Sequence, residues 1–161
     1  AWPWQTRDGA PIGMNIRLEK GGILYMTSED IPAGLQKGSF TLRMRVLVLD
    51  GEEAKIQVGM KSGEAGKIRG FFPVYTKGEW TVQTGELKQM AVPAKKGEWV
   101  TVTYEVTDQS TGSVRWDRHG KILIGEKTLV ERGNFSGEFS EIAISSGSGR
   151  LVVGSLELIR R

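Results

Sequence analysis

The sequence predicts an all-β protein in which two antiparallel sheets pack face to face. Apolar and polar residues alternate along most of the chain, which is typical of strands with one buried side and one solvent-facing side. Turn residues separate these runs at about the spacing found in sandwiches and barrels. Only 31–37 has room for a helical turn, and Pro32 and Gly34 disfavour a longer helix there. Because no helical crossovers connect the strands, we expect antiparallel pairing.

The N-terminal half alternates between expected strands and short turns. The strands are 14–19, 23–27, 39–49, 54–61 and 68–76. Gly21-Gly22, between the first two strands, predicts a hairpin. The longest run, 39–49, ends at the turn Asp50-Gly51. Its apolar residues all fall on one face and are Phe40, Leu42, Met44, Val46 and Val48.

The C-terminal half continues in the same way. Its expected strands are 80–84, 99–107, 113–118, 122–124, 142–145 and 151–159. In the strand 99–107, Tyr104 shares a face with the valines on either side of it, so we expect it in the core. The polar segment 108–112 predicts a chain reversal. The tetrapeptide Lys-Gly-Glu-Trp occurs at 77–80 and again at 96–99, which we interpret as two similar strand starts rather than a duplication.

The segment 97–120 resembles a pattern of concanavalin A-like jelly rolls, which include laminin-G-like and lectin or glucanase domains. It begins with Gly97-Glu98-Trp99 and an alternating strand, and a polar turn leads to a second strand that ends at Trp116-Asp117. Here Arg118 and His119 stand between Asp117 and Gly120. The resemblance covers about the last two thirds of the chain. It implies a jelly-roll sandwich of the kind found in carbohydrate-binding modules, with the last strand near the first and Trp99 in a structural role.

The length predicts one domain spanning 1–161, and we expect a carbohydrate-binding module of this kind outside the cell or on its surface. The chain has 161 residues and no cysteine, so disulfides and thiolate metal sites are excluded. Its net charge of +3 comes from 22 basic and 19 acidic residues spread along the chain. Because no basic cluster is present, we do not expect nucleic-acid binding. No apolar run approaches the ~18 residues of a membrane helix.

Signatures of catalysis are missing, so we expect a chain that is not an enzyme. The E-x-D-x-E arrangement of jelly-roll glycosidases does not occur. The only histidine, His119, is expected in a solvent-exposed turn, which would hold a catalytic base poorly. No cofactor is expected to be required. A structural calcium site stays open, and nothing selects among Asp8, Asp50, Asp108 and Asp117 as its ligands.

Aromatic rings and arginines on strand faces are the candidates for sugar binding. Trp116, Tyr75 and Trp80 would stack on pyranose rings, which have an apolar face. Arg115 and Asp117 flank Trp116 and would hydrogen-bond hydroxyl groups. The remaining candidates are cations predicted to line one outer surface with Lys55 and Lys61. They are Arg43, Arg45 and Arg69. Guanidinium groups bind carboxylates or sulfates in bidentate fashion, so this surface predicts an acidic polysaccharide.

The sequence therefore predicts a non-catalytic carbohydrate-binding module that binds a polysaccharide or oligosaccharide. We expect a monomer or a module of a larger polysaccharide-degrading enzyme. One alternative is a jelly-roll polysaccharide lyase or glycoside hydrolase with an unfamiliar set of catalytic residues. A second alternative is an adhesion domain whose exposed sheet face contacts protein. The basic sheet face itself has an ordinary interpretation as a solvated surface with solubilising charges.

Overall fold

The computed structural model describes residues 12–26, 38–51, 53–61, 68–69, 72–82, 91–109, 118–134 and 139–160. These residues form thirteen strands and no helix. The strands are β1 (Ile12–Leu18), β2 (Ile23–Met26), β3 (Phe40–Asp50), β4 (Glu53–Lys61), β5 (Ile68–Arg69), β6 (Pro73–Thr76), β7 (Glu79–Val82), β8 (Val92–Pro93), β9 (Trp99–Asp108), β10 (Arg118–Ile124), β11 (Lys127–Asn134), β12 (Phe139–Ser145) and β13 (Arg150–Arg160). The described part of the chain contains no helix that could span a membrane.

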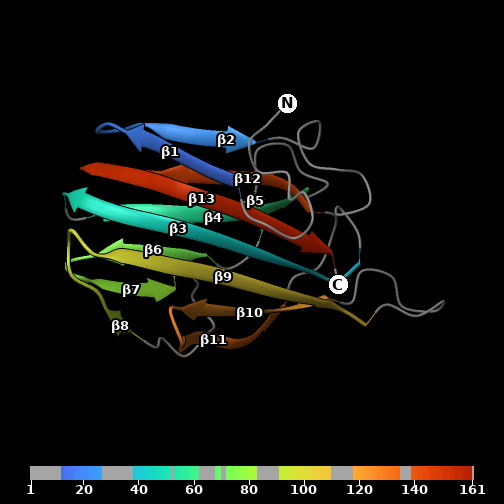
Figure 1. Cartoon of the computed structure of the whole chain (residues 1–161). Helices are drawn as coiled ribbons and strands as arrows, with labels where there is room; N and C mark the ends of the chain where they lie inside the picture. The colour runs from blue at the N-terminus through green and yellow to red at the C-terminus, as the bar shows by residue number, and fades with distance from the viewer. Residues whose placement is uncertain are drawn as a thin grey trace.

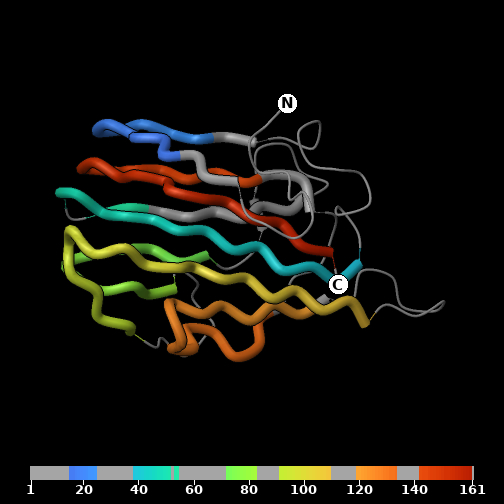
Figure 2. Tube along the Cα trace, viewed as in Figure 1, coloured from blue at the N-terminus to red at the C-terminus, as the bar shows by residue number. Residues whose placement is uncertain are grey.

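The strands form two antiparallel sheets that stack as a sandwich (Figure 1). One sheet has the order β1-β13-β3-β9-β10-β11, and we call it the front sheet. The other, the back sheet, has the order β2-β12-β4-β6-β7-β8, with β5 beside β4. The predicted all-β sandwich is confirmed. The last strand, β13, lies directly beside the first, β1, as the resemblance implied (Figure 2).

Consecutive strands at one end of the sandwich belong to different sheets. β1 pairs with β13 in the front sheet, whereas β2 pairs with β12 in the back sheet. The hairpin predicted at Gly21-Gly22 is therefore wrong, although the turn itself is present. The amide of Gly21 donates to the carbonyl of Gly147, 2.9 Å away, rather than to a partner within a hairpin. The turn after Asp50 crosses between the sheets in the same way, since β3 is in the front sheet and β4 in the back sheet.

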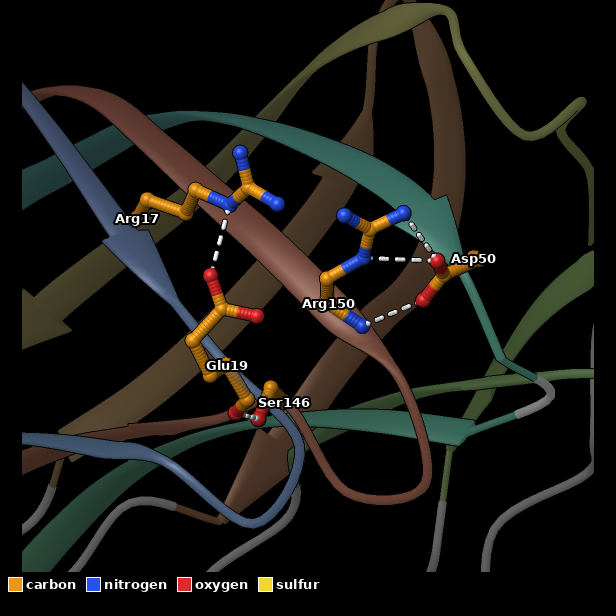
Figure 3. Close-up of polar contacts among 5 residues, drawn as sticks. All are labelled: Arg17, Glu19, Asp50, Ser146 and Arg150. Atoms are coloured by element: carbon orange, nitrogen blue, oxygen red, sulfur yellow. Dashed lines mark hydrogen bonds and ion pairs between the residues drawn. The ribbon is translucent and has the colours of Figure 1, made fainter.

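The turns that carry the chain from one sheet to the other are linked by a small cluster of polar contacts (Figure 3). The hydroxyl of Ser146 donates to the carbonyl of Glu19 and accepts from the amide of Gly22 at 3.0 Å. Asp50 accepts hydrogen bonds from the backbone amide and the Nε of Arg150, at 2.9 and 2.7 Å. Gly149 lies so close to Asp50 that a Cβ atom there would collide with the Asp50 carbonyl. This corner therefore depends on a glycine and a charged pair.

We expect acid to weaken this corner. The hydrogen bond from Arg150 is the largest cause that holds the pKa of Asp50 below its ordinary value of 3.8. A carboxyl group whose pKa is lower in the folded state stabilises the fold above its unfolded pKa, and this stabilisation is lost as pH falls through the folded pKa. Urea unfolding of wild type and Asp50→Asn, followed from about pH 6 to about pH 2, should show a smaller acid dependence in the variant. An exposed control, Glu126→Gln, should follow wild type. Equal acid dependence of all three proteins would contradict the prediction.

The core lies between the inner faces of the two sheets. The predicted apolar face of β3 is buried along its whole length, and Tyr104 is fully buried, as expected. The largest side chains with almost no exposure are Trp80, Tyr75, Tyr104, Phe40, Leu42 and Met44. Each such side chain contributes roughly 1.5–3 kcal/mol through removal from water.

Several strand boundaries differ from the prediction. The expected strand 68–76 is two strands, β5 and β6, which both pair with β4. β8 and β11 were not expected from the sequence. β10 begins at Arg118 and includes the segment predicted to be a turn around His119. The residues 113–117 of the preceding expected strand lie outside the described residues.

Candidate functional site

The outer face of the front sheet carries two of the predicted arginines. Arg43 and Arg45 lie on β3 and are exposed, as expected. Lys55 and Lys61 lie on β4 and Arg69 lies on β5, and both strands belong to the back sheet. The single basic surface predicted from these cations is therefore wrong. The error has one physical cause, since the turn after Asp50 sends the chain into the other layer instead of returning it beside β3.

Arg43 is engaged with a carboxylate of the neighbouring strand. Arg43 and Glu157 face each other in the register of β3 and β13. The Nη1 of Arg43 lies 3.1 Å from Oε2 of Glu157, which is 5% exposed as a residue. A buried carboxylate without a partner destabilises the fold, so we interpret Arg43 as the structural partner of Glu157 rather than as a ligand-binding residue.

Removal of Arg43 should therefore reduce stability. We expect Arg43→Ala to lower the free energy of unfolding by about 1–2 kcal/mol, because Glu157 loses its partner. The loss stays this small because the pair is half-exposed on the Arg43 side, where water screens the interaction. The double variant Arg43→Ala/Glu157→Ala should recover part of this loss, since the uncompensated charge is gone. Denaturant unfolding curves of wild type, Arg43→Ala, Glu157→Ala and the double variant measure the four stabilities. A double variant that equals the sum of its single variants would contradict the pairing.

Trp99 lies on the outer face of the front sheet, and the guanidinium group of Arg45 lies over its ring. The residue is 41% exposed, which corrects the structural role that the resemblance to jelly rolls implied for Trp99. The Cζ of Arg45 lies 4.8 Å from the ring centroid, which is within the range of a cation–π contact. A Cβ atom at Gly154 would lie 2.6 Å from Cζ3 of Trp99, so the ring rests on the space that this glycine leaves. We call these three residues, Arg45, Trp99 and Gly154, the platform.

A bulge in β13 makes the seat for the ring. The pairing of β13 with β3 shifts register between Val153 and Ser155, with Gly154 between them. Leu151 and Val153 point into the core before the bulge, and Leu156 and Leu158 do so after it. One extra residue therefore keeps both halves of the strand apolar on the inside. It also puts a residue without a side chain under Trp99.

A polar groove lies on the same face, toward the other end of β9. Its volume is about 310 Å³. The described residues that line it are all polar or charged and come from β9, β10, β11 and the residue after β9. These are Glu105, Thr107, Gln109, His119, Lys121, Glu131 and Arg132. At ~3.3 Å per residue, Thr107 lies roughly 26 Å from Trp99 along the strand. We call this feature the groove.

His119, one of the groove residues, lies in the strand β10 and not in a turn. His119 pairs with Thr107 of β9 and Asn134 of β11, which corrects the expectation from the sequence. The Nη2 of Arg132 lies 2.8 Å from Nε2 of His119. Because a guanidinium group can only donate, Nε2 accepts in this contact and Nδ1 carries the ring proton. Lys121 and Glu131 face each other nearby, with Nζ 3.9 Å from Oε1.

Two of the predicted sugar-binding aromatics are core residues. Tyr75 and Trp80 are each 1% exposed and belong to the back sheet, so neither presents a ring to a sugar. Their rings meet edge to face, with centroids 5.4 Å apart. The Tyr75 hydroxyl donates to the carbonyl of Ala94 at 3.1 Å. Burial raises the pKa of Tyr75, which keeps the phenol a neutral donor.

Other candidates from the sequence lie outside the described residues. These are Trp116, Arg115 and Asp117, together with the side chain of Arg69. The described residues contain no group of three histidines, cysteines or carboxylates that could hold a metal ion.

Comparison with known proteins gives a shared fold and no family. No protein-family model matches the sequence, and no curated protein matches it. The Trypanosoma rangeli sialidase in complex with 2,3-difluoro-KDN matches 94% of this chain at 14% identity and a TM-score of 0.62. This match covers only 25% of the sialidase chain.

Two further neighbours match over nearly the whole of both chains. Alginate lyase vAL-1 from Chlorella virus has a TM-score of 0.57 at 12% identity, over 98% of this chain and 88% of the lyase. Carbohydrate-binding module CBM66 from Bacillus subtilis has a TM-score of 0.54 at 10% identity, over 93% and 92%. The chain therefore has a jelly-roll sandwich fold shared with sugar-binding and sugar-active proteins. These neighbours include both enzymes and a binding module.

Proposed function

We propose that this chain is a non-catalytic carbohydrate-binding module whose front sheet binds a polysaccharide along β9. The observation that carries the proposal is the exposed residue Trp99, whose ring is seated on Gly154 and has the guanidinium group of Arg45 over it. The part of the indole that Arg45 and Gly154 leave open offers an apolar surface on which a pyranose ring would stack. The groove then supplies carboxylates that accept, and cations that donate, hydrogen bonds to sugar hydroxyls. An extended chain would span both features.

Several finer points belong to the same proposal. We infer an extracellular or cell-surface location, and a role as a monomer or as a module beside a polysaccharide-degrading enzyme. A bound metal is not needed for this binding mode, because ring stacking and hydroxyl contacts supply it. The fold neighbours support sugar recognition in general, since one of them is a carbohydrate-binding module.

A glycan microarray with neutral and uronic polymers tests the proposal. We expect binding to a restricted set of polysaccharides and no release of reducing ends or unsaturated products. A groove variant, Glu105→Ala/Arg132→Ala, should bind the same polymers less tightly while it unfolds at nearly the wild-type denaturant concentration. Absence of binding to every polymer, combined with self-association of the chain, would instead favour an adhesion domain.

A second candidate function is a polysaccharide lyase, and the position of His119 is the observation that favours it. Elimination from a uronate needs a base near the proton next to the carboxylate and a cation near the carboxylate itself. The groove brings His119, Lys121 and Arg132 together. Ultraviolet absorbance of unsaturated products follows this reaction. Product formation that is lost in His119→Ala would establish the lyase and overturn the non-catalytic proposal.

A further inference from the structure

A second cavity lies at the end of the sandwich where β9 begins, separate from the groove. Its volume is about 810 Å³. Its walls come from the β6–β7 turn and from the segment that leads from β8 into β9. The lining residues are Tyr75, Lys77, Gly78, Pro93, Ala94, Lys95, Lys96 and Glu98. We call it the end pocket.

Both Lys-Gly-Glu-Trp segments contribute residues to the lining of the end pocket. Lys77 and Gly78 make the two-residue turn between β6 and β7, with φ angles of 50° and 85°. Both positive values are those of a tight hairpin turn that matches the twist of its strands. Gly97, with a φ of 83°, turns the second segment into β9. The two turns differ, because φ is positive at Lys77 but not at Lys96, yet both copies of the tetrapeptide contribute lysines to the lining of one cavity.

Hydrogen bonds fix the shape of the end pocket. The amide of Ala94 donates to the carbonyl of Gly78 at 2.9 Å, which ties one wall to the other. The hydroxyl of Tyr75 donates to the carbonyl of Ala94 from beneath. The amide of Gly97 donates to the carbonyl of Val48, 2.8 Å away, and this anchors the second turn to β3. A pocket whose backbone is already held in place loses little entropy when it binds a ligand.

The described residues that line the end pocket carry a net positive charge. Among the described residues that line it, three are lysines, Lys77, Lys95 and Lys96, and one is a carboxylate, Glu98. All three lysines are exposed, and within the described part of the chain none has an ion-pair partner. Pro93 and Ala94 add an apolar patch to the wall. Three ammonium groups around a partly apolar pocket match a small ring that carries a carboxylate or a sulfate.

We propose that the end pocket binds an acidic sugar residue, a uronate or a sulfated sugar, of the polysaccharide held by the front sheet. This inference rests on the proposed function. Trp99 follows Glu98 directly in the chain, so the platform begins one residue from the pocket. The proposal assigns recognition of the acidic group to the lysines of the end pocket and not to the arginines of the front sheet. Arg43 is paired with Glu157, and Arg45 lies over the ring of Trp99.

Calorimetry with oligogalacturonate, its neutral methyl ester and a sulfated galactan oligosaccharide tests the inference. We expect wild type to bind at least one acidic ligand about tenfold or more tightly than the ester, with the preference reduced by salt. The double variant Lys77→Gln/Lys96→Gln should lose this preference and keep its affinity for the ester. The matched control Lys20→Gln/Lys127→Gln removes the same charge from two exposed lysines outside the pocket and should keep the preference.

The outcomes separate this inference from the proposed function. Equal affinity of wild type for acidic and neutral ligands would overturn the inference alone and leave the front-sheet module in place. An equal loss in both double variants would also overturn it, because it would reveal attraction by net charge rather than by the pocket. No binding of any of the ligands, here and on the microarray, would overturn the proposed function as well. If wild type binds oligogalacturonate more tightly than the ester, the recognised group is a carboxylate, and if it binds the sulfated oligosaccharide more tightly, the group is a sulfate.

Discussion

Replacement of Trp80 by alanine is expected to lower the free energy of unfolding by about 3–5 kcal/mol. The side chain is 1% exposed and lies in the core beneath the back sheet. Truncation removes the edge-to-face contact with Tyr75 and leaves a cavity in the core. We expect the four-residue strand β7, which is paired with its neighbours, to relax too little to fill this cavity. Such a loss is a large share of the total stability of a small domain. Chemical denaturation followed by circular dichroism measures it.

Trp80→Phe is the matched control for this prediction. The Nε1 of Trp80 is buried and has no hydrogen-bond partner among the described residues. Phenylalanine fills most of the same space and removes this unpaired donor, so we expect it to cost less than half as much as alanine. Trp99→Ala, at an exposed site, should cost less than Trp80→Ala. If Trp99→Ala unfolds the protein and Trp80→Ala leaves it stable, the assignment of core and surface is reversed.

The fold class was predictable because alternation is strong in the central strands. In β3, every second residue from Phe40 to Val48 is buried, as the sequence pattern requires. Alternation reports which side of a strand faces the core. It does not report which sheet the strand joins, and therefore the crossing turns after Leu18 and Asp50 could not be distinguished from hairpins.

The same alternation could have identified Trp99 as a surface residue. Val100, Val102 and Tyr104 point toward the core, so their odd-numbered neighbours point outward, and Trp99 is one of them. The resemblance to the jelly-roll pattern assigned the tryptophan a structural role instead. A second signal lies in β13, where the buried positions change phase around Gly154. That change of phase predicts a bulge, but only the structure shows that the bulge lies beneath Trp99.

Tyr75 and Trp80 were misassigned because their strands are short. β6 and β7 have four residues each, which is too few for a reliable period of two. In β6, three consecutive residues, Pro73, Val74 and Tyr75, are all buried. The groove was missed for a different reason. Its residues come from β9, β10 and β11, and the strand β11 was not expected, so Glu131 and Arg132 had no predicted neighbours.

Trp99→Ala is expected to reduce affinity for the polysaccharide by about 30-fold, while the fold is retained. A tryptophan that acts as a binding hot spot contributes about 2 kcal/mol or more, which corresponds to this ratio. The ring is exposed before binding, so its removal opens no cavity in the core. Affinity electrophoresis in gels that contain the polysaccharide identified on the microarray measures the change, and circular dichroism reports the fold.

Gly154→Ala tests the same platform with the tryptophan still present. The added Cβ atom would lie 2.6 Å from Cζ3 of Trp99, so the ring must shift from its seat and change its contact with Arg45. We expect a loss of affinity in the same direction as Trp99→Ala, since ring stacking depends on orientation as well as on area. Ile23→Ala is the control, because Ile23 is 61% exposed but belongs to the back sheet, and it should bind as wild type does. Wild-type affinity in both Trp99→Ala and Gly154→Ala would remove the platform from the binding site and leave the groove as the remaining candidate on this face.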